Sequence, residues 1–151
     1  MQHSANGKKR VKMLAERLIE DEFDFPPPPQ HIPEWAINEA RQWIGLDDFD
    51  ILVRAESKSG KIVDIEYVAL SINIWGLHVA KGNRAVIYVN RSLPLLWKRF
   101  ALFHELYHLL SHRKGHSFWS RTATPMNSFE HQADMFAWAV IWPEIMKGNL
   151  E

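Results

Sequence analysis

The 151-residue chain contains no cysteine. Disulfide bonds, cysteine-ligated zinc sites and cysteine nucleophiles are therefore excluded. This absence is compatible with the reducing cytosol. A metal site in this chain must be built from histidine and carboxylate side chains, and eight histidines are present.

The chain also lacks an excess of either charge and any long apolar run. Eighteen basic residues balance eighteen acidic ones, which argues against a strongly basic nucleic-acid binder, so we expect no direct nucleic acid binding. The most apolar stretch, Phe136–Ile145, is too short to span a bilayer. No apolar segment follows the polar Met1–Arg10 as it would in a signal peptide. We expect a soluble, cytoplasmic protein without membrane contact.

At about 150 residues per domain, the length predicts one domain with a short extension. Apolar residues in Lys8–Glu22 have helical spacing, and the four prolines Pro26–Pro29 stop this helix and form a stiff connector. We therefore divide the chain into an N-terminal helix with a proline-rich connector, residues 1–30, and a main domain, residues 31–151.

The main domain begins with features of one helix and several strands. Pro33–Gly45 has a proline where a helix starts and a glycine where it ends. The short apolar run Ile51–Val53 and the β-branched residues of Ile62–Trp75 predict strands. Leu77–Val79 and Ala85–Val89 flank a glycine-containing turn, which predicts a hairpin. The sheet should therefore be small and at least partly antiparallel.

Two helices follow in the sequence. Ser92–His112 is crowded with apolar residues, which is typical of a buried helix. Residues 113–127 contain glycine, proline, serine and threonine and are predicted to form a loop. Ser128–Trp142 is helical in pattern and should stop before Pro143. This order of helices and strands predicts the α+β class.

The first of these two helices carries an H-E-x-x-H motif, His104-Glu105-Leu106-Tyr107-His108. Residues four apart lie on one helix face, ~6 Å from each other, so both imidazoles can bind one zinc ion. Glu105 can reach a water on that ion without binding the metal, and its carboxylate can accept a proton.

Zinc needs a third protein ligand, and five downstream residues are candidates: His112, His116, Glu130, His131 and Asp134. His112 lies too far around and along the helix to share an ion with His104. His116 lies in a loop, which is a poor platform for a ligand. We favour Glu130 as the ligand, with Asp134 one turn on accepting a hydrogen bond from a ligating histidine.

Two segments resemble the ImmA/IrrE family of zinc metallopeptidases. Arg99–His112 is similar to the active-site helix of that family, and Glu130–Ala137 is similar to its second motif, E-x-x-A-(N/D)-x-F-A. The resemblance covers roughly Leu77 to Pro143. It implies a zincin-like peptidase fold with an active-site helix and a third-ligand helix. One zinc ion per chain would be held by His104, His108 and Glu130, with Glu105 catalytic.

The chain departs from the family pattern at two places. Tyr107 stands where the family usually has glycine, and it could narrow the substrate cleft. Ile141-Trp142 replaces the usual leucine-methionine before the last proline. The resemblance also implies a partner in trans, because family members often cleave helix-turn-helix repressors. The predicted substrate is thus a protein or peptide, such as a DNA-binding repressor.

A second function from a different class is a non-catalytic zinc-stabilised regulatory or scaffold protein. Glu105 separates the two hypotheses, because a structural zinc site needs no base beside its first ligand. A DNA-associated regulator is a third, weaker hypothesis, against which the neutral charge argues.

Two finer features of the site can be predicted. Five residues could stabilise the substrate oxyanion: Tyr67, His78, His116, Arg121 and His131. Among these we favour His116, which lies between the two ligand helices. We also expect Ala85–Val89 to be a sheet edge that pairs with an extended substrate, with the loop 113–127 as the alternative grip.

Overall fold

The computed structural model describes residues 27–111, 116–119 and 128–148. The predicted helix at 8–22 and parts of the proline connector and of the loop at 113–127 lie outside the described residues. The elements follow in the order α2 (Glu34–Ala40), α3 (Asp48–Ser59), β1 (Ile62–Val68), β2 (Gly76–Lys81), β3 (Arg84–Asn90), α4 (Leu95–Ser111), β4 (His116–Trp119) and α5 (Ser128–Met146).

The four strands form one mixed sheet in the order β1-β3-β2-β4. β3 pairs in parallel with β1 and antiparallel with β2, and β2 pairs antiparallel with β4. The predicted hairpin is confirmed, since β2 and β3 flank a tight turn in which Gly82 has a φ of 62°. The α+β class and the partly antiparallel sheet are confirmed as well.

The position of β3 contradicts the predicted docking edge. Ala85–Val89 pairs with Val63–Tyr67 on one side and with Gly76–Ala80 on the other. Its backbone groups are used within the sheet, so an extended substrate cannot pair with it. The position of this strand in the sequence did not reveal the pairing, because its parallel partner β1 comes from earlier in the chain.

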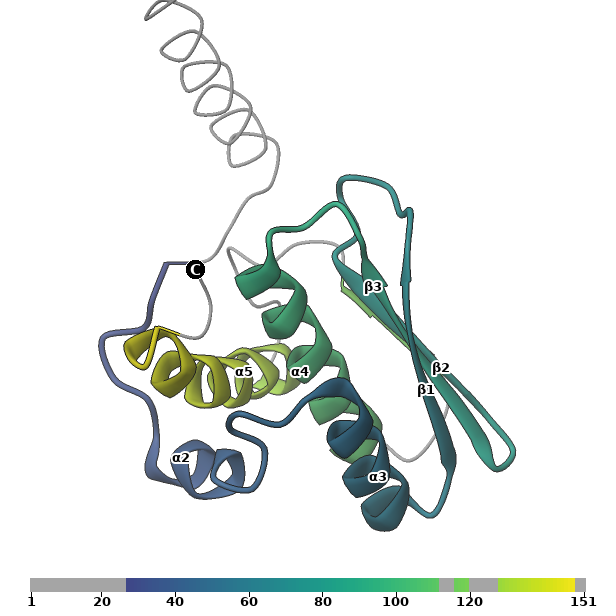
Figure 1. Ribbon diagram of the computed structural model, residues 1–151, viewed down its shortest axis with the longest axis horizontal. Helices are drawn as coiled ribbons and strands as arrows, with labels where there is room; N and C mark the ends of the chain where they lie inside the picture. The colour runs from purple at the N-terminus through teal and green to yellow at the C-terminus, as the bar shows by residue number, and fades with distance from the viewer. Residues whose placement is uncertain (1–26, 112–115, 120–127, 149–151) are drawn as a thin grey trace, which may run out of the picture.

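Helix α4 is the centre of the fold (Figure 1). It contacts β2 and β3 on one side and α5 on the other, while α3 contacts β1 and α2 contacts α5. Every residue from Phe100 to Leu106 is buried, and α5 is buried from Ala133 to Ile141. Two helices that are apolar nearly all round pack together and form the core, as expected for such helices.

The predicted strand at Ile51–Val53 is wrong, because these residues lie in α3. The side chain of Asp47 accepts a hydrogen bond from the Asp50 amide and caps the helix, and Gly60 ends it with a φ of 70°. Ile51 and Ala55 lie one turn apart and are buried. The capping residues and the helical spacing outweigh the β-branched character of a three-residue run.

Three predicted boundaries also differ from the structure. β1 ends at Val68 and does not continue to Trp75. α2 ends at Ala40, and the chain then turns so that the Gly45 amide donates to the Glu144 carboxylate at 2.7 Å. α5 continues through Pro143 to Met146.

The extension of α5 has a tertiary cause. Glu144 is 2 % exposed and accepts two hydrogen bonds from the Arg99 guanidinium, at 2.7 and 2.9 Å. These contacts lie beyond the proline and hold the last turn in place, at the cost of the hydrogen bond that Pro143 cannot donate. The predicted loop at 113–127 likewise contains the short strand β4.

Candidate metal centre

His104 and His108 project from the same side of α4 into the interior. They are 0 % and 3 % exposed, and their ring centroids lie 5.0 Å apart. The i, i+4 spacing on a helix produces this proximity directly. The apolar residues around them keep α4 buried, so both imidazoles face other protein groups and not bulk water.

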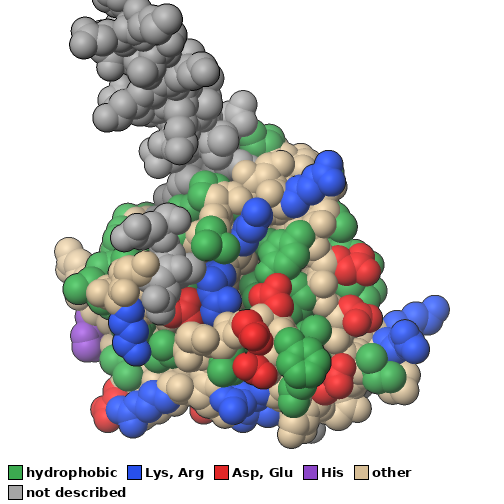
Figure 2. Space-filling model, viewed as in Figure 1, with side chains coloured by type: hydrophobic (Ala, Val, Ile, Leu, Met, Phe, Trp, Pro, Cys, Tyr) green, Lys and Arg blue, Asp and Glu red, His purple; other side chains and the backbone are tan. Residues whose placement is uncertain are grey.

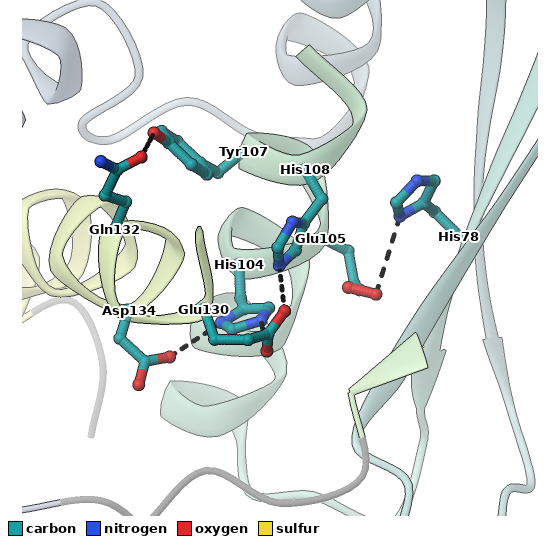
Figure 3. Close-up of polar contacts among 8 residues, drawn as sticks. All are labelled: His78, His104, Glu105, Tyr107, His108, Glu130, Gln132 and Asp134. Atoms are coloured by element: carbon teal, nitrogen blue, oxygen red, sulfur yellow. Dashed lines mark hydrogen bonds and ion pairs between the residues drawn. The ribbon is translucent and has the colours of Figure 1, made fainter. Parts of the chain in front are cut away.

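Glu130, in the first turn of α5, completes a group of three. Its Oε1 lies 2.7 Å from His108 Nε2, and its Oε2 lies 3.2 Å from His104 Nε2 (Figure 3). One ligand atom from each of the three residues lies within 4.8 Å of the other two. Two imidazole nitrogens and one carboxylate oxygen are a donor set that suits zinc, with a fourth position left for water.

Asp134 orients the His104 ring by contacting the ring nitrogen that faces away from Glu130. Its Oδ1 lies 2.8 Å from His104 Nδ1, so the other ring nitrogen, Nε2, faces Glu130 (Figure 3). Glu130 and Asp134 are one turn apart on α5, and this spacing lets them contact opposite ends of one ring. The structure thus brings together all four residues that the sequence analysis grouped as ligands and hydrogen-bonding support.

Charge and burial in this group oppose each other. Burial disfavours the charged form of His104, but hydrogen bonds to Asp134 and Glu130 outweigh it and raise the pKa of His104 to about 9. Burial likewise opposes the charged form of Glu130, yet the two histidines hold the pKa of its carboxyl well below the usual range. The carboxylate between the imidazoles therefore stays ionised, as a metal ligand must be.

Glu105 lies beside this group on the side of the sheet (Figure 3). It is fully buried, and neither of its carboxylate oxygens accepts a hydrogen bond from the described residues. A buried carboxylate without such bonds is costly and therefore indicates a missing partner, such as a water or a cation. The position fits a base that acts next to a metal ion.

The residue nearest to this carboxylate is His78 on β2. Its Nδ1 lies 3.7 Å from Glu105 Oε1, and its ring stacks against that of His108 at 6.3 Å. The sequence analysis included His78 among five candidates but favoured His116. No local pattern in the sequence separated His78 from the other four candidates, because its position beside Glu105 depends on the packing of β2 against α4.

The other four oxyanion candidates are not seen beside Glu105: two have side chains in other places, and the side chains of the other two are not among those that the structure describes. Tyr67 donates from its hydroxyl to Asp48 on α3 at 2.9 Å, and burial raises the pKa of its phenol. His131 is exposed on α5. His116 lies on β4, of which the backbone is described, and Arg121 lies outside the described residues, as does His112.

Tyr107 lies on the side of α4 that faces α5 and α2. Its hydroxyl donates to Gln132 Oε1 at 2.7 Å (Figure 3). Its ring lies 5.9 Å from that of Trp35. It lines a cavity of about 500 Å³ together with residues of α2 and α5. This cavity includes none of the three metal-group residues.

Comparison with known families decides the classification. The sequence model of the Peptidase_M78 family, described as an IrrE N-terminal-like domain, matches residues 46–146. The chain belongs to this family. The match includes α4 and α5 and thus every residue of the metal group, and it supports the zincin-like fold and the resemblance found in the sequence. No curated protein matches the chain.

Two further observations concern the apolar length of the helices and the charge on the surface. No described helix combines the length and the apolar character needed to cross a bilayer. On the face shown in Figure 2, basic and acidic side chains are interspersed.

Proposed function

We propose that this member of the Peptidase_M78 family is a zinc-dependent endopeptidase. The observation that carries the proposal is the fully buried Glu105 carboxylate beside the group of His104, His108 and Glu130. Neither of its oxygens accepts a hydrogen bond from the described residues. His104, His108 and Glu130 would hold one ion per chain. Bound zinc supplies a Lewis acid that polarises a carbonyl and lowers the pKa of water.

The protein groups then have separate tasks. Glu105 accepts a proton from the attacking water and delivers it to the amine leaving group of the cleaved peptide bond. Asp134 holds the His104 ring so that Nε2 faces the metal position. His104 and Glu105 are fully buried, which strengthens the electrostatic contacts among these groups.

The alternative, a zinc-stabilised scaffold without turnover, leaves Glu105 unexplained. A structural zinc site is closed by four protein ligands, whereas the described residues offer a group of three. A scaffold would also tolerate an apolar residue at position 105, which would spare the cost of burying a charge.

The substrate we propose is an extended segment of a protein, such as a DNA-binding repressor. Since β3 is paired on both sides, we place the substrate at β4, which is the last strand of the sheet among the described residues, pairs with β2 and contacts α4. Main-chain pairing with that edge would select flexible or unfolded segments over folded helices. We also propose that the protein acts in the cytoplasm, where such a repressor would be found.

The deciding experiment compares Glu105→Gln with Glu66→Gln, a control at an exposed position on β1. Both proteins are loaded with zinc and incubated with fluorescently labelled casein and with candidate repressors encoded nearby. Glu105→Gln should keep its zinc and lose on the order of 10²–10⁴ in rate, while Glu66→Gln keeps both. Equal hydrolysis by the two variants would refute the role of Glu105, and zinc-loaded wild type without any hydrolysis would favour the scaffold.

A further inference from the structure

The strand β2 borders Glu105 with two residues of the same face. Gly76 and His78 are two residues apart on β2, and both are buried against α4. Val79, the residue after His78, is exposed. Side chains at i and i+2 lie on one side of a strand. One short strand therefore forms the wall against which the Glu105 side chain rests.

Gly76 provides space in this wall. A Cβ atom at this position would lie 3.2 Å from Glu105 Cγ and 3.2 Å from the carbonyl oxygen of Tyr88. The Tyr88 oxygen belongs to the backbone of β3 and cannot easily move. An alanine at position 76 would therefore displace Glu105.

His78 provides the polar group in this wall. Its Nδ1 lies 3.7 Å from Glu105 Oε1, both side chains are almost completely buried, and the two point toward each other (Figure 3). The distance exceeds that of a hydrogen bond but lies within the range of electrostatic attraction in a buried site. No other ion pair of Glu105 occurs among the described residues.

We propose that β2 positions the catalytic base: His78 attracts one carboxylate oxygen of Glu105, and Gly76 leaves the space that its Cγ requires. The second oxygen is then left to face the group of His104, His108 and Glu130. His78 acts through Glu105 and is a positioning residue. This inference rests on the proposed function for its catalytic consequence, while the His78–Glu105 interaction itself can be tested in metal-free protein.

The first test uses two variants of equal shape. His78→Asn keeps an amide near the position of Nδ1, and His78→Leu has the same branching without a polar atom. With casein as substrate, His78→Leu should lower kcat about tenfold to hundredfold, while KM and zinc content stay unchanged. His78→Asn should recover most of the loss, and Val79→Thr, on the exposed face of β2, serves as control. Equal kcat values for the Asn and Leu variants would overturn the proposal.

The second test needs neither metal nor turnover. Urea unfolding of chelator-treated protein compares His78→Leu in the wild-type background and in the Glu105→Gln background. His78→Leu should lower the midpoint more in the wild-type background, because it leaves the Glu105 charge buried without its partner. Additive shifts would overturn the interaction. If wild type hydrolyses nothing but the shifts are non-additive, the peptidase proposal fails and the interaction stands.

A third variant tests the contact between Gly76 and Glu105 and leaves His78 unchanged. Gly76→Ala should retain zinc and lower kcat, since its Cβ displaces the base. Wild-type kcat in folded, zinc-loaded Gly76→Ala would overturn the role given to Gly76.

Discussion

His104 Nδ1 lies 2.8 Å from Asp134 Oδ1, and this contact joins α4 to α5 in the interior of the protein. It fixes the His104 ring with Nε2 toward Glu130, so the orientation of the ligand does not depend on a bound ion. A ring that is held before the ion arrives loses less freedom on binding, which increases affinity.

Asp134→Asn should therefore weaken zinc binding about tenfold to hundredfold. The amide keeps the size of the side chain but removes the charge that favours a proton on Nδ1 and an available lone pair on Nε2. Competition with a chromogenic chelator measures the affinity. Asp64→Asn, an exposed position on β1, is the matched control. Unchanged affinity in Asp134→Asn would show that the contact only joins the helices.

Glu130→Gln should abolish tight zinc binding, because it removes the only carboxylate in the group of three. Wild type purified without chelators and supplied with zinc should contain one ion per chain by elemental analysis. His131→Gln, at the exposed neighbouring position, should retain that content. Full zinc content in Glu130→Gln would contradict the ligand assignment and direct attention to residues outside the described ranges.

The proximity of His104, His108, Glu130 and Asp134 could be predicted from the sequence because it depends on local spacing. H-E-x-x-H and Glu130 with Asp134 each use the four-residue repeat of a helix, and one contact between α4 and α5 brings the two pairs together. No local pattern shows which strands become neighbours. The parallel pairing of β1 with β3, and with it the loss of the docking edge, depends on chain crossover.

The errors in secondary structure have a similar origin. Pro143 is a strong local signal for the end of a helix. The helix nevertheless continues, because Glu144 pairs with Arg99, a residue 45 positions earlier in the sequence. The proximity of His78 to Glu105 was equally hidden, because the two residues belong to different elements. Long-range contacts decided each of these cases.

Arg99→Leu should destabilise the protein by about 3–5 kcal/mol, because it leaves the buried Glu144 carboxylate with the Gly45 amide but without its positively charged partner. The side chains of Arg99 and Glu144 are 12 % and 2 % exposed. The free energy of unfolding from urea titration tests this value. The double variant Arg99→Leu, Glu144→Leu should recover much of the loss, since no uncompensated charge remains. A loss below about 1 kcal/mol in the single variant would place this pair among weak surface ion pairs.

The stability of the metal-free protein should depend on the pKa of His104. This pKa rises from 6.5 to about 9 on folding, so the charged ring stabilises the fold fully below pH 6.5, and the contribution is lost as the pH rises through 9. His104→Gln should therefore be much less stable than wild type at pH 6, and the difference in free energy of unfolding should shrink toward pH 9.5. Urea titrations of chelator-treated proteins at the two pH values measure this difference. Zinc must displace the same proton, so its affinity should increase over this pH range. A difference between wild type and His104→Gln that stays constant or grows with pH would contradict the raised pKa.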